Sequence, residues 1–388
     1  MDALERFCWL ANDMDWEADD ERNASTAISL PSTKEKHLVI YSAQTPQGKP
    51  IRLLKTLLSS ACERDCFYCP FRAGRDKARA TFQPEEFARL FIRLYQAGIA
   101  DGLFLSSGLA GGGRHTQDKL LDTADILRNR LGFRGYLHLK LMPGAEKDQV
   151  WRAMQLADRV SINLEAPNAE RLSRLAPHKG FFNEILQPLQ WVEQIRRSKP
   201  AVQGWQQRWP SSVTQFVLGA AAETDREILQ TTAWLFRSLR LSRAYYSPFR
   251  PVSDTPLENH PPADLLRQRR LYQASFLLRD YGFRLSELNF GADENLPLDV
   301  DPKKAYADRH LLHTPVEINR ASPEQLIRIP GIGQKAAGRI LQARKECRLS
   351  DLSQLKRLGI ETKRAAPYLL LNGRRPPIQL SLFNPLTH

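Results

Sequence analysis

The segment whose residues most clearly suggest chemistry is a loop with three cysteines in eight residues, Cys62, Cys66 and Cys69. Thiolates are good ligands for iron and zinc, and three of them on one turn can hold an iron–sulfur cluster. A four-iron cluster with three cysteine ligands keeps one iron without a protein ligand. That open iron can bind a substrate or a cofactor, so the loop predicts a reactive [4Fe–4S] centre.

Two other uses of these cysteines are a zinc site and a disulfide. Structural zinc takes four nitrogen or sulfur ligands. The remaining cysteines, Cys8 and Cys347, are distant in sequence, although a remote histidine could complete the set. The chain starts without the basic and apolar segments of a secretory signal, which indicates a cytoplasmic protein and disfavours disulfides. The cluster is the favoured prediction, and zinc stays as the weaker alternative.

The residues after the cysteine loop alternate between helical and strand patterns. Helices are expected at 84–97, 118–131 and 147–156, and strands at 102–106, 136–141 and 159–165. In all, residues from about 51 to 250 contain six candidate strands. Strands that alternate with helices of this length predict an α/β fold, a whole or partial parallel barrel.

Two of the expected strands carry polar residues at every second position. His138 and Lys140 share one face of their strand, and Ser161, Asn163 and Glu165 share one face of the next. Strands of a parallel sheet are normally apolar on both faces, and buried polar groups need partners. The pattern therefore favours a ligand site in the barrel interior, although each single residue could equally have a structural role.

The last fifth of the chain has a different composition. Residues 315–388 hold 13 Lys and Arg against five Asp and Glu, within a chain of net charge +13. Ser322 and Pro323 predict a helix start, and the sequence Pro-Gly-Ile-Gly at 330–333 precedes a second helix at 334–344. A weaker copy of this pattern follows at 352–360 and 363–371. Glycines before a helix N-terminus let the backbone approach a phosphate, and this favours a polyanionic partner.

This pattern resembles the helix-hairpin-helix DNA-binding motif. The resemblance implies sequence-independent, salt-sensitive binding to DNA through phosphate contacts. The residues expected to bind DNA are Gly331, Gly333, Lys335, Arg339, Lys363 and Arg364. A helical hairpin that binds another protein is the alternative, and the local positive charge favours DNA.

The cysteine spacing, with Tyr68 just before the last cysteine, resembles the signature of the radical S-adenosylmethionine (SAM) superfamily. The resemblance implies a six-stranded partial barrel in which the open iron chelates the amino and carboxylate groups of SAM. An electron from the cluster then cleaves SAM to a 5′-deoxyadenosyl radical. Transferred by position, the residues expected to bind the cofactor are Tyr68, Ser106, Ser107, Gly108, Lys140, Ser161, Asn163, Glu165, Gln215 and Gly219. The serines at 106 and 107 replace the Gly-Gly-Glu that the superfamily often has there.

Nearly the whole chain resembles a bacterial family of radical SAM proteins with a C-terminal helix-hairpin-helix domain, described as DNA modification or repair proteins. Landmarks of this resemblance are the segments 163–167, 175–179 and 269–273. It implies a radical SAM enzyme that uses a [4Fe–4S] cluster and SAM to modify or repair a nucleotide in DNA. It also implies a reductant such as flavodoxin or ferredoxin and an association with a uracil-DNA-glycosylase-like partner. The alternatives are a radical SAM enzyme acting on RNA and a non-catalytic iron–sulfur protein that binds DNA.

The predicted organisation is a partial (β/α)6 radical SAM barrel followed by a small all-α helix-hairpin-helix domain. The expected parts are an N-terminal extension at 1–50, the barrel with a helical extension at 51–298, a connection at 299–314, tandem hairpins at 315–374 and a tail at 375–388. The extension begins with an acidic segment, 1–22, which we expect to be a solvated arm. No stretch is long and apolar enough for a membrane span.

The tail contains a short apolar motif after two prolines. Gln379, Leu380, Leu382 and Phe383 resemble the peptide by which bacterial polymerases and repair proteins dock on the sliding clamp. The prolines at 376 and 377 favour an extended tether that presents this motif to a partner. The alternative is that these apolar residues pack on their own domain.

Overall fold

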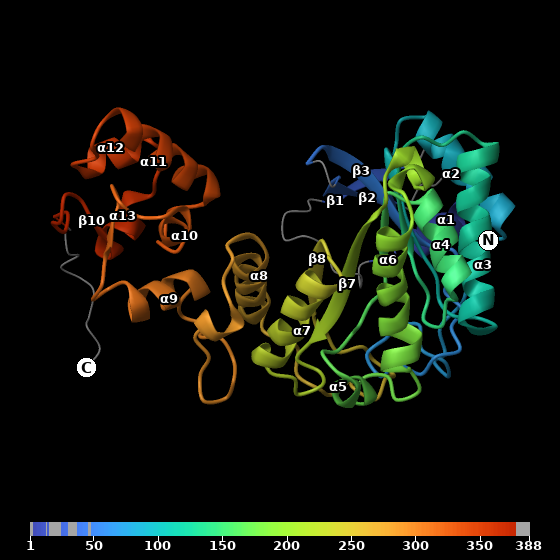
Figure 1. Ribbon diagram of the computed structural model, residues 1–388. Helices are drawn as coiled ribbons and strands as arrows, with labels where there is room; N and C mark the ends of the chain where they lie inside the picture. The colour runs from blue at the N-terminus through green and yellow to red at the C-terminus, as the bar shows by residue number, and fades with distance from the viewer. Residues whose placement is uncertain (1–2, 13, 15–24, 30–36, 46–47, 378–388) are drawn as a thin grey trace. The chain divides into compact units, whose positions relative to one another are not determined.

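The computed structural model describes residues 3–12, 14, 25–29, 37–45 and 48–377, and it divides the chain into two units. The barrel unit comprises Met1–Glu223 and Trp234–Gln268 (Figure 1). The helical unit comprises Thr224–Ala233 and Arg269–His388. The chain passes from one unit to the other three times: just before α7 (Asp225–Ser238), within α7, and within α8 (Leu265–Asp280).

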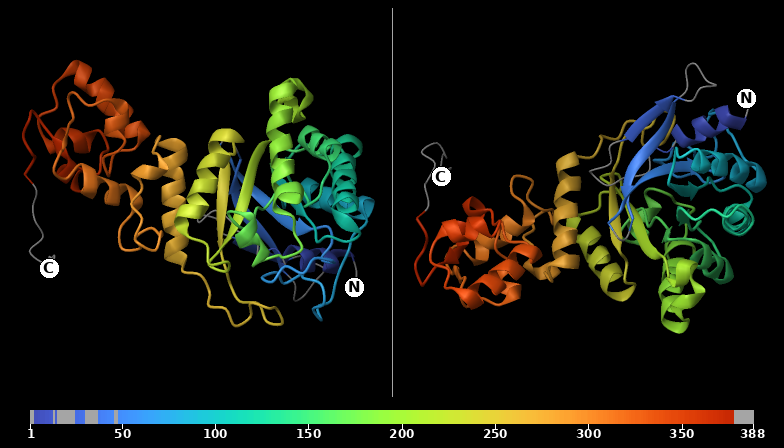
Figure 2. Two further views of the ribbon diagram at one scale, coloured as in Figure 1. Left: turned by 60° about the horizontal axis from the view of Figure 1, so that its bottom comes forward. Right: turned by 90° about the horizontal axis from the view of Figure 1, so that it is seen from above.

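The barrel unit is built on one eight-stranded sheet whose strands follow their order in the chain. The strands are β1 (Ser25–Ser29), β2 (His37–Gln44), β3 (Pro50–Leu57), β4 (Gly102–Ser106), β5 (Tyr136–Lys140), β6 (Arg159–Ser161), β7 (Ser211–Leu218) and β8 (Arg243–Pro248). The pairs β1–β2 and β2–β3 are antiparallel, and β3 to β8 are parallel. The six parallel strands confirm the predicted α/β partial barrel, and Figure 2 shows how the sheet curves.

The helices that connect the parallel strands pack their apolar faces on the sheet. Between β3 and β7 they are α2 (Pro84–Gln96), α3 (Gly112–Asp125) with a π-helical turn at Ile126–Arg130, α4 (Lys147–Leu156), α5 (Ala169–Ser173), a π-helical turn at Phe181–Leu186, and α6 (Gln187–Ser198). In α2 the predicted apolar face, including Phe87 and Phe91, is buried. The predicted helix 118–131 starts earlier, at Gly112, where the Glu63 carboxylate accepts hydrogen bonds from the Gly111 and Gly112 amides. A capping group from the cysteine loop thus satisfies free amides at this helix start.

The N-terminal segment differs from the expected solvated arm. Helix α1 (Ala3–Asn12) buries Phe7, Cys8 and Leu10, and the Phe7 ring lies 5.4 Å from the Phe87 ring. Strand β2 pairs with β3 and so extends the barrel sheet. The prediction is therefore wrong for residues 3–12, because an apolar helical face within the acidic sequence packs against α2.

The helical unit contains the predicted hairpins. Its elements after α8 are α9 (Pro302–His310), β9 (Val316–Glu317), α10 (Pro323–Leu326), α11 (Gln334–Glu346), α12 (Leu352–Arg357), α13 (Thr362–Ala365) and β10 (Leu369–Leu370). The Ser322 side chain accepts a hydrogen bond from the Gln325 amide, which confirms the predicted helix start. The predicted helix 363–371 is wrong after Tyr368, because Leu369–Leu370 is extended and pairs with Val316–Glu317.

The residues predicted to connect the two domains form part of the helical unit. Asp301 caps α9 through its side chain, and the Tyr306 ring of α9 lies 5.0 Å from the Phe283 ring. Residues 269–298, which we expected to extend the barrel, also belong to the helical unit. The boundary between the barrel unit and the helical unit therefore lies inside the predicted range 51–298 and not at its end.

Candidate functional site

The barrel unit has a cavity at the edge where its parallel strands end. All three cysteines of the loop after β3 line it, and we call it the apical cavity. Eight of the residues predicted to bind the cofactor also line it: Tyr68, Ser106, Ser107, Gly108, Lys140, Asn163, Glu165 and Gln215. These residues come from five different loops and strand ends, because the carboxyl ends of parallel strands meet at one edge of a sheet.

Backbone contacts hold the cysteine loop in place. The Phe67 amide donates to the Leu175 carbonyl at 2.7 Å, and the Arg79 guanidinium donates to the Ser60 and Arg72 carbonyls at 3.0 and 2.9 Å. The Cys69 amide donates to the Cys66 carbonyl at 3.2 Å. An irregular loop is thus fixed by the Arg79 side chain and by the backbone of Leu175, which is distant in sequence.

Gly108 allows the end of β4 to lie against the cysteine loop. A Cβ atom at this position would lie 2.3 Å from the Ala61 carbonyl oxygen and 3.2 Å from the Cys62 Cβ. The Gly108 amide donates to the Ser59 carbonyl at 2.7 Å. Any side chain here would push the two loops apart, so the shape of the cavity depends on a residue without a side chain.

The cysteines share the cavity but do not converge on one point. Within the described ranges, no three side chains of His, Cys, Asp or Glu are grouped as the ligands of a single metal ion would be. Burial raises the pKa of the Cys66 thiol, and the nearby Lys179 ammonium opposes this shift. Burial likewise raises the pKa of Cys69. Buried thiolates need positive charge beside them, from a cation or a bound metal.

A buried ion pair lies beside the cysteines. The Lys179 ammonium donates to Glu165 Oε1 at 3.3 Å, and each side chain is only 7% exposed. Burial lowers the pKa of Lys179, but Cys66, Glu165 and Cys69 together raise it above its ordinary value. Lys179 is therefore the positive charge that this group of thiols and carboxylate requires.

The Glu165 backbone is strained in a way that directs its side chain into the cavity. Its φ of 66° is in the left-handed region, which a non-glycine residue rarely adopts. The backbone is held there by two hydrogen bonds with β7, from the Glu165 amide to the Gln215 carbonyl and from the Val217 amide to the Glu165 carbonyl. Glu165 Oε2 is buried and has no hydrogen-bond partner in the described part of the chain. Strain and an unsatisfied carboxylate oxygen together are typical of a ligand site.

The polar faces predicted for the two neighbouring strands do meet in the interior. The Lys140 ammonium donates to Asn163 Oδ1 at 2.7 Å, and both residues line the cavity. Ser161 does not line it: its hydroxyl is hydrogen-bonded to His138 Nε2 at 2.8 Å, in the layer beneath. Burial and then the charges of Arg159, Lys140 and Lys55 hold the pKa of His138 well below its ordinary value. We therefore assign Ser161 and a neutral His138 to the support of the cavity floor.

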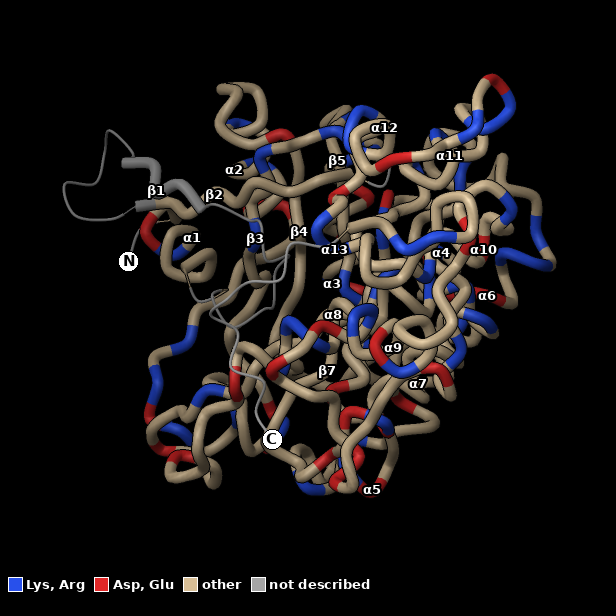
Figure 3. The backbone as a smooth tube through the Cα atoms, turned by 90° about the vertical axis from the view of Figure 1, so that its left-hand side faces the viewer, with Lys and Arg blue, Asp and Glu red and all other residues tan. Residues whose placement is uncertain are grey.

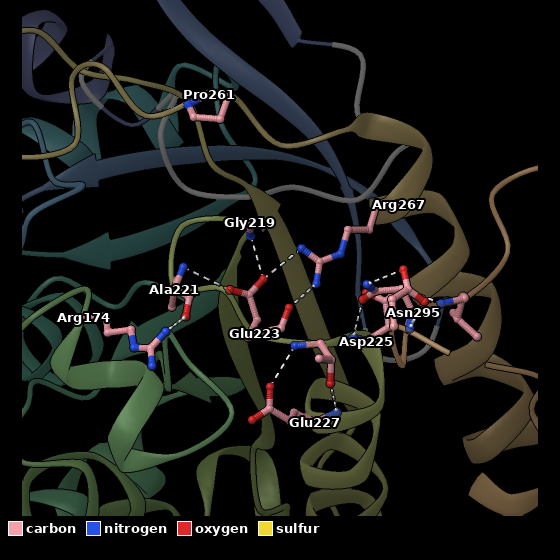
Figure 4. Close-up of polar contacts among 12 residues, drawn as sticks. Arg174, Gly219, Ala221, Glu223, Asp225, Glu227, Pro261, Arg267 and Asn295 are labelled. Atoms are coloured by element: carbon pink, nitrogen blue, oxygen red, sulfur yellow. Dashed lines mark hydrogen bonds and ion pairs between the residues drawn. The ribbon is translucent and has the colours of Figure 1, made fainter. Parts of the chain in front are cut away.

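Gly219 does not line the cavity either. Its amide donates to Glu223 Oε1 at 2.6 Å, and Arg267 also donates to this oxygen, at 3.0 Å. Glu223 Oε2 accepts from the Ala221 amide at 3.1 Å, so one carboxylate organises the whole loop after β7 (Figure 4). Gly219 has a φ of 85°, and a Cβ on this residue would lie 2.9 Å from the Ala263 Cβ. The turn itself therefore requires glycine at this position.

Several cavity residues were not expected from the sequence pattern. Lys179 lies in the landmark segment 175–179, and Arg64 lies between two of the cysteines. Both are therefore close in sequence to residues that the sequence analysis singled out. Phe249 and Arg250 follow β8, the last of the six parallel strands. No sequence pattern indicated Met14, because only the tertiary fold brings this N-terminal residue to the cavity.

The predicted DNA-binding residues lie together in the helical unit. Gly331 has a φ of 83°, and a Cβ there would lie 2.7 Å from the Glu361 carbonyl oxygen, so the first hairpin contacts the second. Gly333 is the N-cap of α11. The four charged residues of the prediction are exposed: Lys335, Arg339, Lys363 and Arg364. Lys and Arg outnumber Asp and Glu in residues 315–388, and Figure 3 colours the charged positions along the described backbone.

Helix α9 supports the first hairpin from within the same unit. The Lys303 ammonium donates to the Ile332 carbonyl at 2.6 Å, and burial, followed by the charge of Arg364, lowers the pKa of Lys303 to about 7. Arg364 pairs with Asp301 at 2.7 Å and is thus already partly neutralised. Among the predicted DNA contacts, Lys335, Arg339 and Lys363 therefore carry the less compensated charge.

The predicted clamp-binding residues Gln379, Leu380, Leu382 and Phe383 lie outside the described residues. The clamp partner stays a prediction from the sequence. In the described part of the chain, no helix is both long and apolar enough to cross a membrane.

Comparison with known proteins supports the motif in the helical unit. A family model described as a helix-hairpin-helix motif matches residues 313–366. No curated protein matches the sequence.

Solved structures similar to this chain include those of three enzymes. The [FeFe]-hydrogenase maturase HydG from Carboxydothermus hydrogenoformans is 14% identical with a TM-score of 0.46, over 58% of this chain and 51% of that one. Methylornithine synthase (PylB) is 14% identical with a TM-score of 0.46, over 58% and 61% of the two chains. The cobalamin-dependent S-adenosylmethionine radical enzyme OxsB is 13% identical with a TM-score of 0.34, over 61% and 36%. The match thus spans about half the length of HydG and less than two thirds of PylB.

Proposed function

We propose that this protein is a radical SAM enzyme that modifies or repairs a nucleotide in DNA. The observation that carries the proposal is the apical cavity, where Cys62, Cys66 and Cys69 lie together with the Lys179–Glu165 pair. A helix-hairpin-helix unit in the same chain adds the nucleic-acid partner.

The residues of the cavity fit a cluster and SAM by their chemistry. Cys62, Cys66 and Cys69 would hold a [4Fe–4S] cluster, which leaves one iron for a ligand that is not protein. The Glu165 Oε2 atom, buried without a partner in the described structure, is an acceptor for an ammonium or hydroxyl group. When bound, the cluster would supply the electron that cleaves SAM, and flavodoxin or ferredoxin would be suitable reductants.

The protein's own residues would prepare the site for these groups. Lys179 offsets the charge of the thiolates and of Glu165, which burial would otherwise make costly. Lys140 and Asn163 hold each other at the cavity wall, so their remaining polar atoms keep a fixed orientation towards a ligand. Phe71 and Phe249 supply apolar wall and limit the access of water.

The helical unit would bring DNA to the enzyme without reading its sequence. Lys335 and Lys363 are exposed cations beside the two hairpins, suited to phosphate contacts that weaken as salt increases. A base inside a duplex is inaccessible to a buried cavity, so the target nucleotide must be extruded or single-stranded. The glycosylase-like partner and the sliding clamp rest on the sequence resemblance alone.

The test is anaerobic incubation of the reconstituted protein with SAM, a reductant and DNA, followed by mass spectrometry of the nucleosides. Damaged duplex, intact duplex, single-stranded DNA and RNA should be compared. We expect a new or altered nucleoside from DNA, and its formation should require both SAM and the three cysteines. A product from RNA only would favour the RNA-modifying alternative, and SAM cleavage without any nucleic-acid product would reject the DNA substrate.

A further inference from the structure

A second cavity lies at the opposite edge of the barrel sheet, where the parallel strands begin. It has a volume of about 270 Å³ and is lined by residues that precede or start β6, β7 and β8. We call it the basal cavity, and its chemically important residues are Asp158, Arg196, Trp205, Arg208, Trp209 and Arg240. The apical cavity is at the other end of these strands, so the two cavities are separate.

The basal cavity has more positive charge than the surrounding acids neutralise. Its one acidic residue, Asp158, pairs with Arg128 at 2.9 Å. Glu193 lies 3.8 Å from Arg196 and 3.4 Å from Arg240, so one carboxylate serves two of the cavity's arginines. The Arg208 side chain donates to the neutral Gln206 side chain at 3.0 Å, and no acidic partner of Arg208 occurs among the residues described. Guanidinium groups in this arrangement favour an anion, above all a phosphate.

Two indole rings form the other part of the cavity wall. Trp209 donates from Nε1 to the Lys199 carbonyl at 3.2 Å, and its ring lies 5.8 Å from the Trp151 ring. The Arg128 guanidinium lies 3.9 Å from the centre of the Trp205 ring. Trp205 Nε1 is buried, and the described structure offers it no acceptor. Indole surface next to guanidinium groups suits a planar base joined to a phosphate better than it suits a bare anion.

The backbone around the basal cavity is held in an unusual conformation. Gln206, Gln207 and Arg240 have φ values of 51°, 60° and 47°, in the left-handed region. A Cβ at Gly204 would lie 2.0 Å from the Arg208 carbonyl oxygen, so the turn that carries Trp205 and Arg208 closes tightly on itself. Such strain persists only where the surrounding structure fixes it, and it is common at ligand sites.

We propose that the basal cavity binds a nucleotide, with the phosphate at Arg208 and Arg240 and the base against the tryptophans. The nucleotide is either free or part of a single-stranded nucleic acid, since both present the same base and phosphate. The usual role of this end of a barrel is stability, which explains apolar packing but not an open cavity where Arg196 and Arg240 share one carboxylate and Arg208 has no acidic partner among the described residues. This inference does not depend on the cysteine loop or on the proposed reaction.

The test measures binding of thymidine triphosphate, a short oligothymidine and inorganic pyrophosphate to the full-length protein. The Lys335→Glu/Lys363→Glu background removes the contribution of the hairpins, and thymidine avoids the adenosine that an SAM site would accept. We expect saturable binding of at least one thymidine ligand, weakened at least about tenfold by Arg208→Gln with Arg240→Gln. The matched control Arg89→Gln changes an exposed arginine on α2 and should leave binding unchanged. Circular dichroism and thermal unfolding show whether each variant is folded.

The ligands also distinguish the two sources of the nucleotide. Tighter binding of oligothymidine indicates a nucleic-acid strand, and tighter binding of the triphosphate indicates a free nucleotide. Pyrophosphate that binds as tightly as the triphosphate would contradict the role of the tryptophans. The proposal is overturned if neither thymidine ligand binds at about 1 mM, or if the folded double variant binds as tightly as its parent.

Discussion

The apical cavity and the hairpin surface of the helical unit are built in opposite ways. In the cavity, a few buried groups depend on one another: the thiols, Lys179 and Glu165 interact electrostatically, and Gly108 permits their loops to meet. The hairpin surface is formed by Lys335, Arg339 and Lys363, and all three are exposed. Changes in the cavity should therefore be large and non-additive, whereas changes on the surface should be small and roughly additive.

The largest expected effect follows from loss of a cysteine. Cys62→Ala, Cys66→Ala or Cys69→Ala should each reduce the iron and sulfide content after anaerobic reconstitution to background, because a four-iron cluster needs all three protein ligands. The matched control is Cys347→Ala, since Cys347 is exposed and does not line the cavity. Full iron content in a Cys66→Ala protein would contradict the ligand assignment.

Gly108→Val should come next in magnitude. Its side chain would collide with the Ala61 carbonyl, so we expect separation of the two loops and destabilisation by several kcal/mol. Gly338→Ala is the control, because no atom lies within 4 Å of a Cβ at this helical position. That control should be neutral or stabilise the protein by about 0.5–1 kcal/mol. Urea unfolding measures both, and an equally stable Gly108→Val protein would show that the loops do not require this close approach.

The buried ion pair should reveal coupling between its partners. Lys179→Met leaves Glu165 without its cation and should destabilise the protein by about 3 kcal/mol, with loss of SAM affinity. Adding Glu165→Gln should restore much of the stability, because the unpaired charge is then removed, but it should not restore SAM binding. Unfolding and equilibrium dialysis of the single and double variants test this. Additive losses of stability would contradict the coupling.

On the hairpin surface, single changes should be modest and cumulative. Lys335→Gln and Lys363→Gln should each reduce the slope of log K against log salt concentration for duplex DNA by about 1, and together by about 2. Arg364→Gln is the informative comparison, because Asp301 already pairs with this arginine and a smaller change is expected. A slope that the double change leaves unaltered would show that the DNA binds elsewhere.

The smallest expected effect concerns pH and Lys303. Its pKa in the folded protein is about 7, below the ordinary value of 10.5, so between these two pH values the unfolded chain binds more protons than the folded chain. The free energy of unfolding contributed by Lys303 should therefore increase as pH rises from about 7 to 10. In Lys303→Met this increase should be smaller than in the parent protein, as measured by urea unfolding at several pH values. An identical pH dependence in both proteins would contradict the buried ammonium at the hairpin.

The sequence was most informative where a local pattern decides the structure. Strand Gly102–Ser106 and helix Lys147–Leu156 have the predicted bounds, because apolar spacing and caps define them locally. The alternation also predicted that Lys140 and Asn163 face the barrel interior, where both line the cavity. The alternation does not reveal how far along the barrel axis each residue lies. Ser161 was therefore predicted to bind the cofactor with Asn163, whereas it lies beneath the cavity and contacts His138.

Other parts of the structure depend on contacts that no local pattern reveals. Lys179 does not lie at the end of a strand, so the strand pattern did not indicate it. Its charge acts on Cys66 only because its loop packs beside that cysteine. Residues 369–370 end the last predicted helix because they pair with Val316–Glu317, more than fifty residues earlier. The packing of α1 was also missed, because the acidic composition of the N-terminal segment suggested a solvated arm. The helix that covers the apolar face of α1 is α2, which is distant in sequence.

The most direct test of the apical cavity is reductive cleavage of SAM by the anaerobically reconstituted protein without any DNA. Liquid chromatography with mass spectrometry should detect 5′-deoxyadenosine and methionine formed in the presence of reductant. We expect this cleavage in the wild type and in Cys347→Ala, and none in Cys66→Ala. A wild-type protein that contains a full four-iron cluster, binds SAM and never cleaves it would contradict the account and favour a non-catalytic iron–sulfur protein.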